Sequence, residues 1–244
     1  MLDPKIEELL KEIFGAKSGW LGGEFNRLKM CPGFDDITAF APLINRGVGE
    51  EELQIFIEEH PQFLFGLFGA GDESDLAFIT KPRVGKMNAD FAILNYGQGG
   101  CTISLIEIER ASCDLFNKGN TFTHDLQKAM SQVYSWSEWI EKNQNTFVRD
   151  TLDDAMKLPL YPEKHKNKSF KLEDADKIEG VWKNFGGFDY PVIKYAIVIG
   201  RWSKLSKDHQ QKLIHLNTKE GYLKSVYTFE QLIRTAYTRP QRLP

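Results

Sequence analysis

Two stretches with alternating apolar residues, "NADFAILNY" (88–96) and "TISLIEIE" (102–109), constrain the fold of this 244-residue chain more than any other feature. Alternation with a period of two is typical of β-strands, and the "GQGG" segment between them predicts a hairpin turn. If the turn is centred on that segment, the numbers of paired residues sum to 197. Asp90 then lies directly opposite Glu107.

The second of these strands also carries Glu109, two residues after Glu107, so both glutamates project from one face. With Asp90 opposite, three carboxylates converge, which costs free energy through repulsion and lost hydration. A divalent cation such as Mg²⁺ or Mn²⁺ would offset this cost, because hard cations prefer carboxylate ligands. A bulge in the hairpin would shift the register and favour another interpretation. In that case a glutamate faces solvent or pairs with a basic residue such as Lys86, Arg110 or Lys118.

The composition limits the classes of function. Hydrophobic residues make up 41% of the chain and charged residues 27%, as in a soluble globular protein with one core domain. No apolar run is long enough to span a membrane, and the N-terminus does not resemble a signal peptide, so we expect a cytoplasmic protein without a membrane partner. The net charge of −3 provides no general attraction to nucleic acid, which would need local basic patches. The three cysteines lack CxxC spacing, so we interpret them as packing residues.

The order of the other elements predicts helices that cover a mixed sheet. Helical patterns occur in residues 4–15, 47–69, 121–143, 206–217 and 228–236, and further strands are expected in 192–200 and 223–227. We divide the chain into an N-terminal helix with an irregular segment, 1–49, and a core domain, 50–244. A polar insertion is expected near 146–190.

A helix with an acidic residue, an Asp on one strand, ExK on the next strand and a helix with Gln form the pattern of PD-(D/E)xK phosphodiesterases, which this sequence resembles. More narrowly, "EEELQIFIEEHPQFL", "KPRVGKMNADFAIL", "LIEIERASCDLFNKGNTFTHDLQKAMSQVYSWSEWI" and "YAIVIGR" with "VYTFEQLI" are similar to the Shedu-type nuclease domain of prokaryotic antiphage defence. The resemblance covers about residues 50–236. It implies an α/β fold with a restriction-endonuclease-like core, in which helices flank a mixed central sheet.

By position, the resemblance implies that Asp90 and Glu107 bind Mg²⁺ or Mn²⁺ and that Gln132 is the helix glutamine. Glu59, in preference to Glu58, would be the acidic residue of the preceding helix. The chain departs from the family at Glu109, where the pattern has lysine. A glutamate there would act as general base or further metal ligand, or the site would be inactive.

The expected function is therefore metal-dependent DNA cleavage in antiphage defence, by a protein that assembles as a homo-oligomer. The alternative is a catalytically inactive relative that binds nucleic acid or a partner protein through the same fold. Three basic residues before Asp90 would contact phosphate, supply the missing cation from a shifted position, or form an ordinary basic loop. These residues are Lys81, Arg83 and Lys86.

Overall fold

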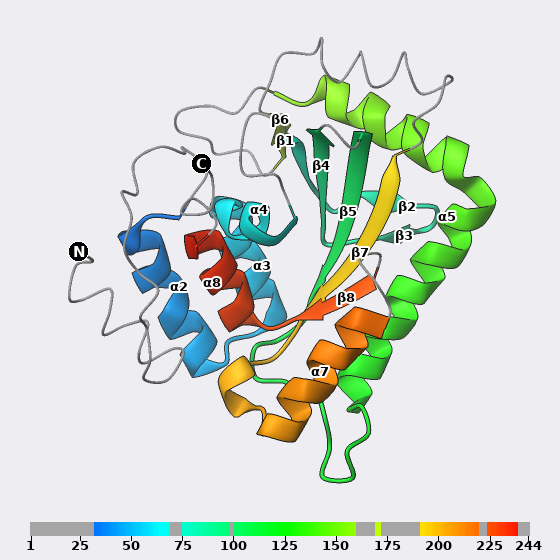
Figure 1. Cartoon of the computed structure of the whole chain (residues 1–244). Helices are drawn as coiled ribbons and strands as arrows, with labels where there is room; N and C mark the ends of the chain where they lie inside the picture. The colour runs from blue at the N-terminus through cyan, green and yellow to red at the C-terminus, as the bar shows by residue number, and fades with distance from the viewer. Residues whose placement is uncertain are drawn as a thin grey trace.

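The computed structural model describes residues 32–68, 75–97, 100–159, 169–171, 191–219 and 224–238. Within them, one mixed β-sheet lies between two layers of helices, as Figure 1 shows. The sequence prediction of an α/β fold with a mixed central sheet flanked by helices is confirmed. This architecture is compatible with a restriction-endonuclease-like core.

The main sheet has six strands in the order β6-β1-β4-β5-β7-β8. The pairs from β6 to β5 are antiparallel, whereas β7 and β8 continue the sheet in parallel with β5. The strands are β6 (Phe170–Lys171), β1 (Asp75–Thr80), β4 (Phe91–Gly97), β5 (Gly100–Ile108), β7 (Val192–Val198) and β8 (Lys224–Tyr227). A small separate hairpin of β2 (Arg83–Val84) and β3 (Met87–Asn88) links β1 to β4.

The register of the β4–β5 hairpin agrees with the sequence prediction. Phe91 pairs with Ile106, and the same sum of residue numbers, 197, holds along the pairing to Gly97 and Gly100. The pairing contains no register shift, so the alternative of a bulge is wrong. The next position in this register sets Asp90 beside Glu107.

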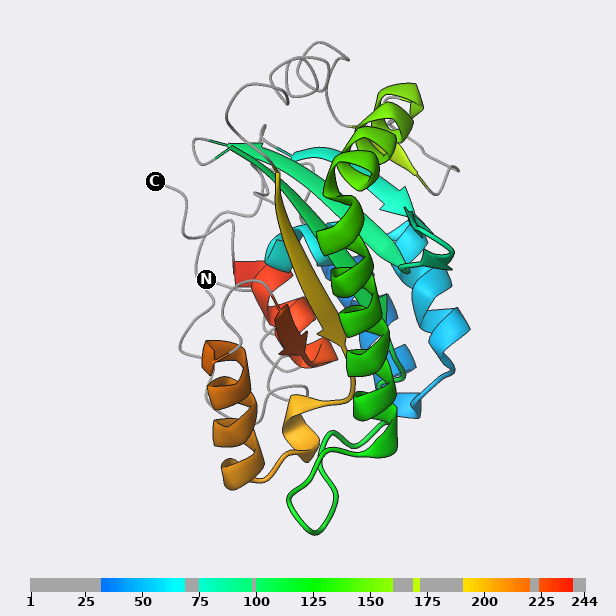
Figure 2. The same cartoon turned by 90° about the vertical axis from the view of Figure 1, so that its right-hand side faces the viewer.

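The two faces of the sheet have different helical covers (Figures 1 and 2). One face packs mainly against α5 (His124–Lys157), with Trp136 fully buried in its core. The opposite face packs against α2, α3, α4 and α8 in a core rich in phenylalanine. These helices span Phe34–Arg46, Glu50–Glu59, Gln62–Phe68 and Phe229–Thr238, while η1 (Trp202–Lys204) and α7 (Lys207–Lys219) connect β7 to β8.

Helix α5 is longer than its sequence pattern predicted. Thr123 caps its start by accepting a hydrogen bond from the Leu126 N–H, and the helix bends at Asn143 but continues to Lys157. The polar insertion therefore does not begin at residue 146, because buried Phe147, Val148 and Leu152 keep this part of the helix on the sheet. Residues 160–168 and 172–190 lie outside the described part of the chain.

The prediction of an irregular segment up to residue 49 is also wrong for α2. Ile37, Phe40 and Ile44 have helical spacing and are buried, but Pro42 and the flanking glycines obscured the pattern. Asp36 stabilises the start by accepting the Gly33 N–H at 2.7 Å. The predicted helix in residues 4–15 lies outside the described residues.

Two other findings bear on the sequence predictions. Cys101 and Cys113 are buried and free, as expected of packing residues, whereas Cys31 lies outside the described residues. Across the ranges that the structure describes, we find no helix with the length and apolar character needed to cross a membrane.

Candidate functional site

Three of the predicted site carboxylates lie together at the end of β5. Asp90 directly precedes β4, Glu107 is the second-last residue of β5, and Glu109 is the first residue after that strand. Each is buried, with 6% of its surface exposed. By strand alternation all three belong to the face that packs against α5, together with Ala92 and Leu105.

Both carboxylate oxygens of Asp90 have partners. Oδ2 accepts a hydrogen bond from the Ile108 N–H at 2.7 Å, which links the end of β5 to the start of β4. Oδ1 lies 2.5 Å from the Lys81 ammonium. The Asp90 N–H also donates to the Ile106 carbonyl, at 3.1 Å. Asp90 is therefore held by its backbone, a neighbouring N–H and one cation.

Lys81 reaches Asp90 because the chain reverses direction between β1 and β4. Its N–H donates to the Asp90 carbonyl at 2.8 Å, and its backbone adopts the left-handed conformation with φ of 50°. That conformation is uncommon for a residue with a Cβ. Half of the Lys81 side chain is exposed, so the ammonium borders both the carboxylates and solvent.

Helix α3 supplies two further polar groups to the site. The buried Gln54 side chain accepts a hydrogen bond from the Lys81 ammonium at 2.7 Å and donates to Glu50 at 2.9 Å. Glu50 begins the helix, and the spacing of four residues sets both side chains on one face. The sequence pattern did not single out this pair. The one indication in the sequence was that Gln54, a polar residue, lies next to Leu53 in the apolar stripe of the predicted helix.

Glu107 is the least compensated carboxylate of the group. Burial, together with the nearby charges of Asp90, Glu109 and Glu50, raises its pKa to about 9, while Lys81 opposes the shift. Its Oε2 atom is buried and has no hydrogen-bond partner. A buried carboxyl oxygen without a partner costs free energy, and a bound cation would remove that cost.

Glu109 lies nearer to α5. Burial raises its pKa, as do the charges of Glu50, Asp125 and Asp90, whereas Lys128 of α5 lowers it. Lys128 is thus a second cation that acts on the acidic residues, and no sequence motif indicated it. Strand β7 holds the backbone of Glu109 in place, because the Glu109 N–H donates to the Val198 carbonyl at 2.8 Å.

These oxygen donors suit Mg²⁺ or Mn²⁺ chemically, but they are not arranged as a finished metal site. Among the described residues, no three His, Cys, Asp or Glu side chains are placed to hold a metal ion as they stand. The contacts of Asp90 give a physical reason, since Lys81 and the Ile108 N–H use its two oxygens. A cation could bind Asp90 Oδ1 only after the lysine moves away.

The other two predicted site residues are placed less directly. Gln132 is half-buried on α5, one turn after Lys128, and so shares its face of the helix. Glu59 is exposed at the last position of α3. The α3 carboxylate whose charge raises the pKa of Glu107 and Glu109 is Glu50, at the opposite end of the helix. Roles for Gln132 and Glu59 stay predictions.

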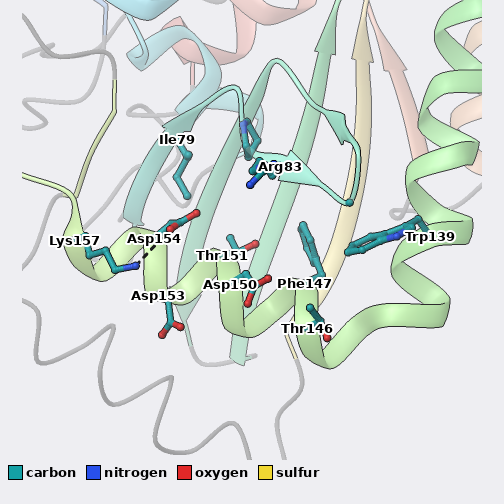
Figure 3. Close-up of a pocket in the computed structure, with 12 residues that line it drawn as sticks. Ile79, Arg83, Trp139, Thr146, Phe147, Asp150, Thr151, Asp153, Asp154 and Lys157 are labelled. Carbon is teal, nitrogen blue, oxygen red and sulfur yellow. Dashed lines mark ion pairs between the residues drawn. The ribbon is translucent and has the colours of Figure 1, made fainter.

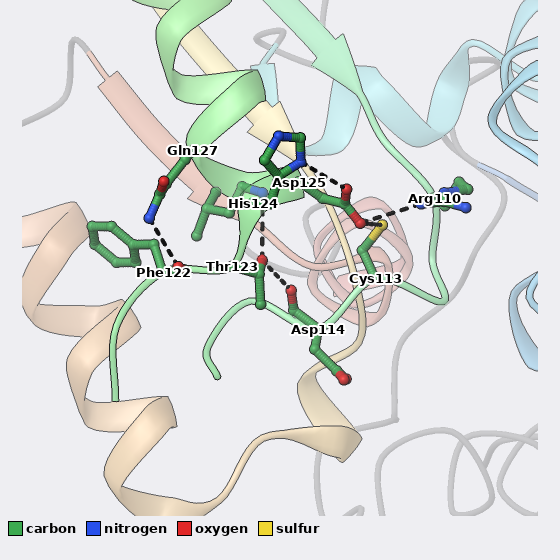
Figure 4. Close-up of polar contacts among 9 residues, drawn as sticks. Arg110, Cys113, Asp114, Phe122, Thr123, His124, Asp125 and Gln127 are labelled. Atoms are coloured by element: carbon green, nitrogen blue, oxygen red, sulfur yellow. Dashed lines mark hydrogen bonds and ion pairs between the residues drawn. The ribbon is translucent and has the colours of Figure 1, made fainter. Parts of the chain in front are cut away.

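Arg110 does not neutralise the glutamates before it. Figure 4 shows its guanidinium directed to Asp125 at the start of α5, at 3.2 Å. The Cys113 thiol also donates to Asp125, at 3.1 Å, and burial raises the pKa of this thiol to about 11. Its hydrogen bond to Asp125 ties the loop after β5 to α5, as expected of a packing residue, and the raised pKa disfavours the reactive thiolate.

A separate cavity of about 490 Å³ lies between the second half of α5 and the β2–β3 hairpin (Figure 3). Trp139 and Arg83 line it, but so do the three carboxylates of Asp150, Asp153 and Asp154. Acidic side chains repel phosphate groups. We therefore do not assign nucleic-acid binding to this cavity.

Comparison with known proteins identifies the family. A family model described as "Shedu protein SduA, C-terminal" matches residues 48–233, which is more than half of the chain. No curated protein matches the chain at a significant level. The matched region contains β1–β5, α5 and the whole group of carboxylates. The chain therefore belongs to the Shedu family, which is associated with antiphage defence.

Proposed function

We propose that this Shedu-family chain is a metal-dependent phosphodiesterase that cleaves DNA. The observation that carries the proposal is the buried Oε2 atom of Glu107, which lacks a hydrogen-bond partner next to Asp90, Glu109 and Glu50. Carboxylates are brought together in this way at functional sites more often than in structural ones, because the arrangement costs stability. A cation that binds there would recover that cost.

Asp90 and Glu107 would hold the cation through their carboxylate oxygens. Mg²⁺ or Mn²⁺ would supply Lewis-acid chemistry, neutralising charge on the phosphate and lowering the pKa of a water molecule. The raised pKa of Glu109 makes this residue a stronger base at neutral pH. Glu109 would accept the proton of the attacking water, and Gln132 would position the water or the DNA backbone.

Hydrolysis would proceed by in-line attack. The water oxygen forms a bond to phosphorus, its proton passes to Glu109, and the opposite phosphorus–oxygen bond breaks. The leaving oxygen then takes a proton from solvent. Such chemistry needs accurate placement of the water and stabilisation of developing charge, which rigid strand ends provide.

The second candidate is a catalytically inactive relative that binds nucleic acid or a partner protein. Two observations favour it: Glu109 stands where the family pattern has lysine, and Lys81 already compensates Asp90. Such a protein would bind DNA or a partner protein without cleaving it. Assembly into a homo-oligomer is compatible with either function and stays a prediction.

Incubation with supercoiled plasmid separates the two functions. We expect the protein to nick or linearise the plasmid with Mg²⁺ or Mn²⁺ and to lose this activity with a chelator. Asp90→Asn should abolish cleavage, whereas Asp208→Asn, an exposed position of α7, should leave it unchanged. Plasmid binding without cleavage, in either cation, would reject the nuclease and favour the binding module.

A further inference from the structure

We propose that Lys81 is an exchangeable cation of this site, which holds Asp90 in the metal-free protein and moves to the scissile phosphate when the metal binds. The proposal rests on the proposed phosphodiesterase function. It assigns to Lys81 the positive charge that Glu109 cannot supply. Lys81 would then be a catalytic residue, because its ammonium would touch the reacting phosphate.

The contacts of the ammonium support a position that can change. The ammonium pairs with Asp90 at 2.5 Å and donates a hydrogen bond to the neutral amide of Gln54 at 2.7 Å, and its charge also acts on Glu50 and Glu107. Gln54 orients the ammonium without neutralising it. Since half of the side chain is exposed, the ammonium can reach a substrate that approaches from solvent.

The backbone of Lys81 gives an independent reason to assign a role to the side chain. Its φ of 50° is sterically costly for a lysine and free of cost for glycine. Strained backbone of this kind concentrates at functional sites. The Lys81–Asp90 and Pro82–Ala89 backbone hydrogen bonds, at 2.8 and 3.0 Å, hold the turn closed and direct the side chain to Asp90.

The same contacts imply competition with a metal. The Ile108 N–H donates a buried hydrogen bond to Asp90 Oδ2. Oδ1 is therefore the oxygen at which a metal cation would replace Lys81. Removing the ammonium removes both this competitor and a repulsive charge. Metal binding should therefore become tighter in the same variants that lose the phosphate contact. A purely structural lysine would not produce these opposite effects.

The test compares Mn²⁺ affinity with plasmid cleavage in Lys81→Met and Lys81→Gly. Free Mn²⁺ is measured by electron paramagnetic resonance without DNA. We expect affinity to rise about tenfold in both variants. Cleavage at saturating Mn²⁺ should fall by about 10² to 10³. Glycine relieves the backbone strain, so this variant should fold even if Lys81→Met does not.

Lys142→Met is the matched control, because Lys142 is an exposed lysine of α5 that has no part in the proposed site, and it should change neither measurement. Unchanged or weaker Mn²⁺ binding in a folded Lys81→Gly variant would overturn the exchange, as would cleavage equal to wild type. If the wild-type protein cleaves no plasmid, the proposed function fails. The Mn²⁺ affinities would then still decide whether Lys81 competes with a metal for Asp90.

Discussion

Glu107 and Glu230 are both buried glutamates, yet their surroundings are opposite. Glu230 is fully buried and accepts hydrogen bonds from Arg201 Nε at 3.1 Å, the Trp202 N–H at 2.6 Å and the Ser203 hydroxyl at 2.7 Å. Glu107 has an oxygen with no hydrogen-bond partner and three carboxylates as its main charged neighbours. The first glutamate is satisfied by donors, and the second is opposed by like charges.

The difference shows how a structural carboxylate is distinguished from a functional one. The donors around Glu230 join η1 to α8, so its charge contributes to the fold. The environment of Glu107 disfavours its charge and leaves its Oε2 atom without a hydrogen-bond partner. Replacing Glu107 should therefore reduce cleavage without reducing stability, whereas replacing Glu230 should reduce stability.

The largest expected effect is the loss of DNA cleavage in Glu107→Gln, by about 10³ or more, because a ligand of the proposed cation is removed. The free energy of unfolding should exceed that of wild type at pH 7, because part of the stabilisation from protonated Glu107 is already lost there, and the difference should be larger at pH 9. Plasmid assays and urea titrations measure the two quantities. Glu138→Gln, an exposed change on α5, should alter neither. Retained cleavage in Glu107→Gln would show that Glu107 is not a functional carboxylate.

Glu230→Ala should have the opposite effect and lower the free energy of unfolding by about 3 to 5 kcal/mol, because it leaves the largely buried Arg201 guanidinium unpaired. Urea titration measures this change. Mn²⁺ affinity of the folded variant should equal that of wild type. If Glu230→Ala is no less stable than Glu107→Gln, the distinction between the two glutamates is wrong.

Glu109 tests the position at which the chain departs from the family. Glu109→Gln should reduce cleavage by about 10² through the loss of proton transfer. Glu109→Lys should reduce it further, since the added positive charge repels the cation. A gain of cleavage in Glu109→Lys would mean that the lysine role is vacant, which would also count against Lys81. Wild-type activity in both variants would make Glu109 an ordinary buried carboxylate.

The smallest expected effect is a pH dependence of stability without metal. The folded-state pKa of Glu107, about 9, lies above its usual value, so the native state binds the proton more tightly than the unfolded state. This stabilisation is complete below about pH 4.5 and is lost as the pH rises through about 9. The melting temperature in chelator should fall over this range by several degrees more in wild type than in Glu107→Gln. Equal slopes would show that Glu107 titrates normally.

The sequence predicted the parts of the fold that depend on local pattern. The β4–β5 register follows from alternation and a short turn, and it brings Asp90 beside Glu107. Helix α2 was missed because Pro42 interrupts a helical period. The continuation of α5 past Asn143 was also missed, because tertiary packing of Phe147 and Leu152 outweighs a polar composition.

The site was only partly predictable for a similar reason. Asp90, Glu107 and Glu109 follow from the periods of two neighbouring strands. Glu50, Gln54 and Lys128 reach the site from helices, and only the packing of those helices on the sheet brings them there. Lys81 was one of three basic candidates, and its left-handed backbone selects it over Arg83 and Lys86.

Calorimetric titration with Mn²⁺ near pH 7 tests most directly whether Glu107 belongs to a cation site. Burial and its acidic neighbours keep Glu107 protonated at that pH, so binding should release about one proton per cation, measured from the heats in two buffers. We expect binding in the micromolar-to-millimolar range, its loss in Glu107→Gln and its retention in Glu230→Gln. Equal Mn²⁺ binding by wild type and Glu107→Gln, or no binding by wild type at millimolar Mn²⁺, would contradict the account.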